Sequence, residues 1–220
     1  MIRNDAEVFF TKMDFLKLFK SLFVNNTDLE NTAITNRKPE DVRMLFIGPS
    51  RVGKSFLINC IFGRQNSRAI PTEGLSYDTL TYFKDDCSYD ILITELGGDE
   101  TMKKLRKPVF LFKDTIIFVF NVNSVDSYNE VKEIVSEFSE CDPSKISATQ
   151  TFFLCTTLSK SAPKYFNSND MEDMNNLIGS KIKTENVRIH FVEIRLDSME
   201  DCNSIMNYII SESINHKFGC

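Results

Sequence analysis

The clearest chemical signal in the sequence is a short segment that runs from Gly48 to Ser55. It matches the pattern GxxxxGK[ST], in which two glycines let the backbone curl so that successive N–H groups point at phosphate oxygens. The side chain of Lys54 is expected to reach the β and γ phosphates of a nucleotide, and the Ser55 hydroxyl to bind Mg²⁺. The predicted phosphate-binding residues are Gly48, Pro49, Ser50, Arg51, Val52, Gly53, Lys54 and Ser55. The simpler alternative is an ordinary turn between a strand and a helix.

Such a loop needs a buried strand before it and a helix after it, and the sequence indicates both. Residues 42–47 are apolar, and residues 54–62 are predicted to be helical. Further strands are predicted at 77–83, 89–94, 115–122, 151–155 and 187–194, and helices around 131–138, 170–178 and 201–215. The polar connection at 84–88 is short enough for an antiparallel hairpin, and the apolar run at 115–122 belongs at the sheet centre. This alternation predicts an α/β fold of the P-loop NTPase type, with a six-stranded, mostly parallel sheet and helices on both faces.

A nucleotide switch needs two further segments that touch Mg²⁺ and the γ-phosphate. The order of the elements predicts one segment before the second strand and one after the third. The first position holds Pro71-Thr72-Glu73-Gly74, and the second holds Glu95-Leu96-Gly97-Gly98. Both are therefore candidates for the mobile parts of a switch.

On these motifs the chain resembles the Arf-like small GTPases, from about Val42 to Asn215. In that family a Pro-Thr-x-Gly segment forms switch I, and a Gly-Gly pair that ends an acidic motif opens switch II. The resemblance implies GTP or GDP with Mg²⁺ as the bound cofactors. It also implies that Thr72 is a second Mg²⁺ ligand and that the Gly98 amide donates to the γ-phosphate. Glu95 stands where most relatives have Asp, and it is expected to contact Mg²⁺ only through a water molecule.

Three departures from the family pattern fall on groups that select guanine or perform hydrolysis. The Asn-Lys-x-Asp motif falls on Thr156-Thr157-Leu158-Ser159, which has no carboxylate to accept hydrogen bonds from guanine. Thr156 and Thr157 are kept as candidate nucleotide-binding residues. The Ser-Ala segment that packs on the base falls near Arg195-Leu196. Asp99 stands where many GTPases have a water-orienting Gln, so hydrolysis of GTP to GDP and phosphate is expected to be slow. Asp99 is the candidate to position the attacking water in place of that Gln. The alternative is that Asp99 is a solvated loop carboxylate without this role.

Three function classes follow from these residues. The leading one is an Arf-like regulatory switch, and the second is a scaffold of the same fold with relaxed or lost nucleotide specificity that acts through protein contacts. The third is a P-loop kinase or ATPase with an arginine-rich lid, for which Arg106 among Lys103, Lys104 and Lys107 is the one candidate. A solvated basic helix face is the simpler interpretation of that cluster.

The residues before the first strand predict a separate N-terminal extension. Residues 1–25 have an amphipathic helical pattern, residues 26–40 form a polar linker, and residues 41–220 form the nucleotide-binding domain. This helix either lies on a membrane surface or packs on the domain or a partner. Ile2 replaces the Gly that myristoylation needs, and Cys220 lacks a prenylation box, so no lipid is expected.

Composition excludes several other classes. The chain has 26 basic and 31 acidic residues and a net charge of -5, which argues against a nucleic-acid partner. Six cysteines without a CxxC pair and two histidines favour neither a zinc site nor a disulfide framework, so all six are expected to be reduced thiols. No apolar run is long enough to span a bilayer, and no signal-peptide core is found, so a cytoplasmic location is expected.

The expected partners are proteins. Apolar residues of the predicted hairpin that are expected to be exposed, among them Leu75, Tyr82 and Phe83, lie between the two switch segments. Relatives use this edge for effectors, and strand alternation must bury about half of such residues. An exchange factor and an activating protein are also expected from the resemblance.

Overall fold

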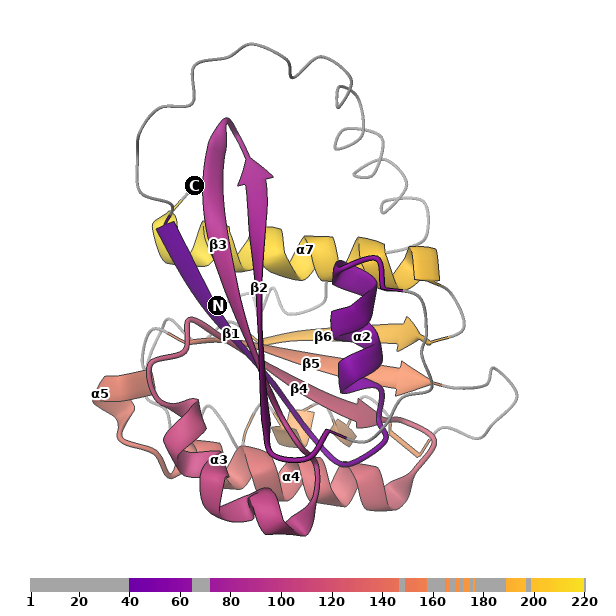
Figure 1. Ribbon diagram of the computed structural model, residues 1–220. Coiled ribbons are helices and arrows are strands. Elements are labelled where there is room, and N and C mark those ends of the chain that lie inside the picture. The colour runs from indigo at the N-terminus through magenta and orange to yellow at the C-terminus, as the bar shows by residue number, and fades with distance from the viewer. Residues whose placement is uncertain are drawn as a thin grey trace, which may run out of the picture. The chain divides into compact units, whose positions relative to one another are not determined.

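The strands lie side by side in one sheet with helices on both faces (Figure 1). This computed structural model describes residues 40–64, 72–146, 149–157, 165–166, 169–170, 172–174, 176, 189–196 and 199–219. In this part of the chain the strands are β1 (Glu40–Ile47), β2 (Leu75–Lys84), β3 (Cys87–Leu96), β4 (Thr115–Asn121), β5 (Gln150–Thr157) and β6 (Ile189–Arg195). The helices are α2 (Lys54–Ile61), the short 3-10 helix η1 (Glu100–Met102), α3 (Lys103–Phe110), α4 (Val125–Ser139), α5 (Pro143–Ile146) and α7 (Met199–Phe218).

The sheet is parallel except at one edge. Its six strands follow the order β2-β3-β1-β4-β5-β6, and only β2 runs antiparallel to its neighbour. The predicted six-stranded, mostly parallel sheet is therefore confirmed. The run predicted for the sheet centre is confirmed too, because β4 lies between β1 and β5. The carboxyl ends of the parallel strands share one edge of the sheet, and the loop after β1 begins there.

Two apolar layers cover the two faces of the sheet. On one face Val42, Met44 and Phe46 of β1 pack with α2 and α7. On the other, Leu45 and Ile47 pack with α3 and α4. Because both faces are covered, consecutive residues of β1 are buried, and the strand reads as a continuous apolar run rather than an alternating one.

The hairpin that joins β2 to β3 is tighter than predicted. Lys84 pairs directly with Cys87, so the turn consists of Asp85 and Asp86 alone. Both aspartates have positive φ, 48° and 61°, which a two-residue hairpin turn requires and which Asp tolerates better than most side chains. The antiparallel pairing is confirmed, and the predicted five-residue connection is wrong.

Two strands extend further than the sequence predicted. Glu95 and Leu96 are the last residues of β3, where they pair with Ser76 and Leu75 of β2. Likewise, β5 continues through Thr157 because β6 pairs alongside it. The prediction that these residues lie in loops is therefore wrong, and strand pairing fixes their backbones. A short helix, α5, which the sequence did not predict, begins at Pro143.

Several predicted features lie outside the described residues and stay predictions. They are the N-terminal helix, the linker as far as residue 39, Pro71, Leu158, Ser159 and positions 171, 175, 177 and 178 of the helix expected at 170–178. The described residues of that expected helix, 170, 172–174 and 176, are helical. Strand β1 begins at Glu40, one residue before the predicted domain start. Among the described helices, none combines the length and apolarity needed to cross a membrane. None of the cysteines in the described part of the chain is in a disulfide; they are Cys60, Cys87, Cys141, Cys155 and Cys202.

Candidate functional site

The predicted phosphate loop connects β1 to α2 and leaves no room for side chains at its two glycines. A Cβ on Gly48 would lie 1.9 Å from the carbonyl oxygen of Val119 in β4. A Cβ on Gly53 would lie 2.5 Å from the Leu196 side chain, and Gly53 also has a left-handed φ of 100°. The Gly53 carbonyl then accepts from the Leu57 N–H at 2.9 Å, which starts α2. The glycine pattern therefore has a steric cause here, as expected for a loop that curls around an anion.

Lys54 is the first residue of α2, and its side chain turns back into the loop. Its Nζ donates to the carbonyl oxygens of Gly48 at 2.9 Å and Pro49 at 2.7 Å. The side chain is buried, and this burial lowers the pKa of Lys54 to about 8, against the opposing pull of Glu95 and Glu130. Lys54 is thus a buried cation held by neutral carbonyls, which is a suitable donor for phosphate oxygens.

Because only the charged form of Lys54 attracts phosphate, we expect nucleotide affinity to fall as the pH rises above about 8. Bound phosphates favour the protonated amine and raise its pKa in the complex. Affinity is therefore constant below the free-state pKa and then falls by up to about tenfold per pH unit until the bound-state pKa is reached. Dissociation constants for a nonhydrolysable triphosphate measured from pH 7 to 9.5 would test this. Lys54→Arg is the control, since arginine stays charged; parallel pH profiles for both proteins would contradict the prediction.

The three predicted Mg²⁺-binding residues converge on one point. The Ser55 hydroxyl donates to Oε1 of Glu95 at 2.7 Å, and the Thr72 hydroxyl contacts the same Oε1 at 3.1 Å. The two hydroxyl oxygens lie 3.0 Å apart. Glu95 is buried, and the other two side chains are partly buried. These residues come from α2, the segment before β2, and the end of β3, so the fold assembles oxygen ligands of the kind that Mg²⁺ prefers.

The two glycines of the second switch segment lie against the backbones of the first switch segment and the phosphate loop. The Gly97 N–H donates to the carbonyl oxygen of Gly74 at 2.8 Å, which ties the two switch segments together. A Cβ on Gly98 would lie 2.2 Å from the amide nitrogen of Ser50 and 2.3 Å from the carbonyl carbon of Pro49. Gly98 therefore packs directly on the phosphate loop, where no other residue type fits without displacement.

Asp99 already has a role in this structure. Its side chain accepts from the Thr101 N–H at 2.9 Å and caps η1. This hydrogen bond lowers the pKa of the exposed Asp99 carboxyl. This hydrogen bond favours the interpretation of Asp99 as a loop carboxylate over its interpretation as the group that orients the attacking water.

The hydroxyls of Thr156 and Thr157 both donate to protein oxygens. The Thr156 hydroxyl donates to the carbonyl of Phe120 at 3.0 Å, and that of Thr157 donates to Oδ1 of Asn123 at 2.8 Å. Both threonines are buried. Leu196, from the expected base-packing segment, lies next to Gly53 of the phosphate loop, as its close approach there shows. Asn123 was not predicted from the sequence. It follows β4, and its side-chain amide oxygen accepts the hydrogen bond from Thr157 at the end of β5.

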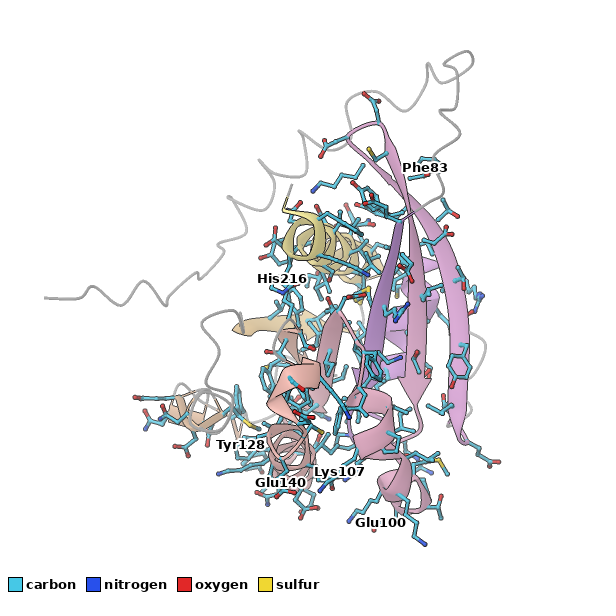
Figure 2. All side chains as sticks on the ribbon, turned by 90° about the vertical axis from the view of Figure 1, so that its left-hand side faces the viewer. Phe83, Glu100, Lys107, Tyr128, Glu140 and His216 are labelled. Carbon is cyan, nitrogen blue, oxygen red and sulfur yellow. The ribbon has the colours of Figure 1, made fainter. Side chains whose placement is uncertain are left out.

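Arg106 was expected on a solvated basic face, and that interpretation is wrong. The Arg106 side chain is buried, and its guanidinium lies 3.1 Å from a Glu137 oxygen and 3.5 Å from a Glu130 oxygen. These pairs tie α3, just after the second switch segment, to α4. The neighbouring Lys107 instead makes an exposed pair with Glu140 at 3.0 Å (Figure 2). A guanidinium paired in this way is no free lid residue of a kinase.

Replacing Arg106 with alanine is expected to destabilise the fold by about 2–3 kcal/mol. Breaking a fully buried ion pair costs about 3–5 kcal/mol, and the value is reduced here because Glu130 and Glu137 are 32% and 27% exposed. Urea unfolding would measure the loss. Lys107→Ala removes the same charge from an exposed pair on the same helix and should change stability far less. Equal losses of unfolding free energy in Arg106→Ala and Lys107→Ala would show that the buried pairs stabilise the fold no more than the exposed pair does.

Strand alternation separates Tyr82 from Tyr77 and Phe83 in β2, whereas Leu75 lies on the same side of the strand as those two. Leu75 and Tyr82, which were expected to be exposed, are half-buried and pack against the two cores. Phe83 is 76% exposed near the hairpin turn (Figure 2). Tyr77, six residues earlier and therefore on the same face of β2, is 71% exposed. The sequence reasoning named Phe83 but missed Tyr77. The outer face of β2 thus presents two aromatic side chains.

Comparison with known proteins identifies the class. The model of the Ras family matches residues 43–156, which is just over half of the chain and includes the phosphate loop, the described switch residues, β2 to β4 and most of β1 and β5. The chain therefore belongs to the Ras family, and its fold is that of a Ras-type GTPase domain.

The chain is similar to several named members of this superfamily. It is 25% identical over 105 residues to ADP-ribosylation factor-like protein 2 of Dictyostelium discoideum, 32% over 100 residues to GTP-binding protein Rhes of Mus musculus, and 30% over 103 residues to Ras-related protein Rab-15 of Homo sapiens. Each match covers 44% to 46% of this chain. The matched part spans only 37% to 55% of the length of these relatives.

Proposed function

We propose that the chain is a GTP-binding regulatory switch of the Arf-like type. A guanine nucleotide and Mg²⁺ bind at the phosphate loop, and the γ-phosphate holds Thr72 and Gly98 in place. The observation that carries this proposal is the convergence of Ser55, Thr72 and Glu95 within 2.7–3.1 Å, with Gly98 packed on the loop beside them. Ras-family GTPases bind GTP or GDP with Mg²⁺, and the two hydroxyls and one carboxylate present here fit that cation.

The chemistry of the site divides among these residues. Lys54 supplies a buried positive charge for the phosphates, and the loop amides supply neutral donors. Ser55, Thr72 and Glu95 would hold the Mg²⁺, which neutralises phosphate charge when bound. Hydrolysis is proposed to be slow, because Asp99 is occupied as a helix cap and no glutamine follows Gly98.

The Arf-like assignment rests on motif order and one relative. The Pro-Thr-x-Gly and Gly-Gly segments have Arf-like spacing, and an ADP-ribosylation factor-like protein is among the similar proteins. The Glu-Leu-Gly-Gly run that begins at Glu95 further resembles ADP-ribosylation factor-like protein 16. A Ras or Rab type of switch is the nearest rival within the superfamily.

A pseudo-GTPase scaffold is the second candidate function. It is favoured by the hydroxyls of Thr156 and Thr157, which donate to Phe120 and Asn123 at the place where relatives recognise guanine. Without a carboxylate there, selectivity for guanine over adenine would be lost or would depend on other groups.

Amide hydrogen exchange compares the two candidates. A switch should show slower exchange at residues 72–76 and 95–102 with a nonhydrolysable triphosphate than with a diphosphate, because the γ-phosphate holds both segments. The amides at the C-terminal end of α7, where Lys217 contacts Asp41 at the start of β1, serve as an internal reference. Identical exchange in both states would contradict a switch and support a scaffold.

The outer face of β2, with Tyr77 and Phe83, is proposed as the place where an effector protein docks in the triphosphate state. Exchange factors and activating proteins are further proposed partners. A pull-down with triphosphate, diphosphate and the Lys54→Ala variant tests the effector. Preference for the triphosphate form is expected, and equal capture in all three would contradict it.

A further inference from the structure

The oxygen atoms of Ser55, Thr72 and Glu95 form a nearly regular triangle. Its edges are 2.7 Å between Ser55 Oγ and Glu95 Oε1, 3.0 Å between the two hydroxyl oxygens, and 3.1 Å between Thr72 Oγ1 and the same Glu95 Oε1. A single carboxylate oxygen thus faces both hydroxyls.

The oxygen–oxygen separations in this triangle fit Mg²⁺ better than Ca²⁺. In octahedral coordination with Mg–O distances of about 2.0–2.1 Å, neighbouring ligand oxygens lie about 2.9 Å apart. With Ca²⁺, at about 2.3–2.6 Å, the corresponding separation would be about 3.3–3.7 Å. The three side-chain oxygens therefore have the spacing of one face of a Mg²⁺ octahedron, and the opposite face is left for phosphate oxygens and water.

The backbone of Glu95 is fixed in the sheet on both sides. It pairs with Ser76 of β2 and with Phe46 of β1, so its reach is set by the length of its side chain. The carboxylate is buried and electrostatically coupled to Lys54. An aspartate at this position would be one methylene shorter, which leaves space for about one water molecule between the carboxylate and the cation.

We propose that Glu95 is a direct ligand of the bound Mg²⁺, in place of a bridging water, and that Ser55 and Thr72 complete the protein side of the coordination shell. This inference rests on the proposed nucleotide and cation site. It departs from the expectation from the sequence that Glu95 acts only through water, and the experiment below decides between the two. A third protein oxygen that carries negative charge makes cation retention less dependent on the nucleotide phosphates.

The number of water molecules on the cation tests this directly. Mn²⁺ replaces Mg²⁺ in the complex with a nonhydrolysable GTP analogue, and electron paramagnetic resonance in isotopically labelled water counts the coordinated waters. Three protein oxygens and two phosphate oxygens leave a single position for water in the unmodified protein. Glu95→Asp should gain one water and bind Mn²⁺ about tenfold more weakly. Asp90→Asn removes a carboxylate from the same strand outside the site and should change neither value.

The possible results distinguish a failure of direct Glu95 ligation from a failure of the proposed function. Two or more waters in the unmodified protein, or equal counts in the unmodified protein and Glu95→Asp, would overturn direct ligation and leave the proposed function intact. Failure of the folded, unmodified protein to bind the Mn²⁺ nucleotide at all would overturn both. The absolute count in the unmodified protein decides the matter even if a variant does not fold.

Discussion

Replacing Lys54 with alanine is expected to weaken the binding of a nucleoside triphosphate by about a hundredfold to ten-thousandfold. A hydrogen bond to a charged group contributes about 1.5–3 kcal/mol, and the lysine is expected to make two of them, to the β and γ phosphates. The buried position strengthens the effect, since little water competes for the charge. Fluorescence titration of nucleotide-stripped protein measures the change.

Lys132→Ala is the matched control for Lys54→Ala. It removes the same charge from a partly exposed position on α4, where Lys132 lies 3.9 Å from Asp173. This variant should bind nucleotide like the unmodified protein. If Lys54→Ala retained full affinity while folded, the phosphate loop would not be the binding site.

The Gly98→Ala variant is expected to lose the preference for triphosphate over diphosphate. The new methyl group would lie 2.2 Å from the Ser50 amide nitrogen and 2.3 Å from the Pro49 carbonyl carbon, and both are backbone atoms that cannot turn aside. The second switch segment must then move away from the loop, and the Gly98 amide loses its place at the γ-phosphate. We expect the ratio of the two dissociation constants to fall to about one, with a loss of stability of about 1–3 kcal/mol from overpacking.

The measurement compares affinities for a nonhydrolysable triphosphate and a diphosphate in one series. Gly63→Asn is the control, because nothing lies within 4 Å of a Cβ there and Asn tolerates the left-handed φ of 60°. A Gly98→Ala protein that still preferred the triphosphate as strongly as the unmodified protein would show that the close approach of Gly98 has no part in sensing the γ-phosphate.

The fold could be predicted because its signals are local. The apolar run of β4 and the glycine pattern of the phosphate loop each occupy a few consecutive residues, and each has one structural interpretation. The meeting of Thr72 with Ser55 was predictable from the order of elements and the family resemblance. The distances from these two hydroxyls to Glu95 were not predictable, because they depend on where β3 ends.

What the sequence did not reveal depends on contacts between distant segments. Strand pairing on both sides extends β3 through Glu95, and no local pattern marks that extension. Arg106 was misjudged because its partners Glu130 and Glu137 are on another helix. Their spacing of two helical turns on α4 was a usable signal, since it places two carboxylates on one face. Sequence alone could not tell which face of α4 meets α3.

The phosphate loop is proposed to bind a guanine nucleotide with Mg²⁺. The most direct measurement is the affinity of nucleotide-stripped protein for fluorescent GTP, GDP and ATP, with and without Mg²⁺. We predict micromolar or tighter binding of GTP that requires Mg²⁺ and exceeds the binding of ATP. Equal binding of GTP and ATP would contradict guanine selection and leave a phosphate-only site. No binding of any of the three by folded protein would contradict the switch altogether.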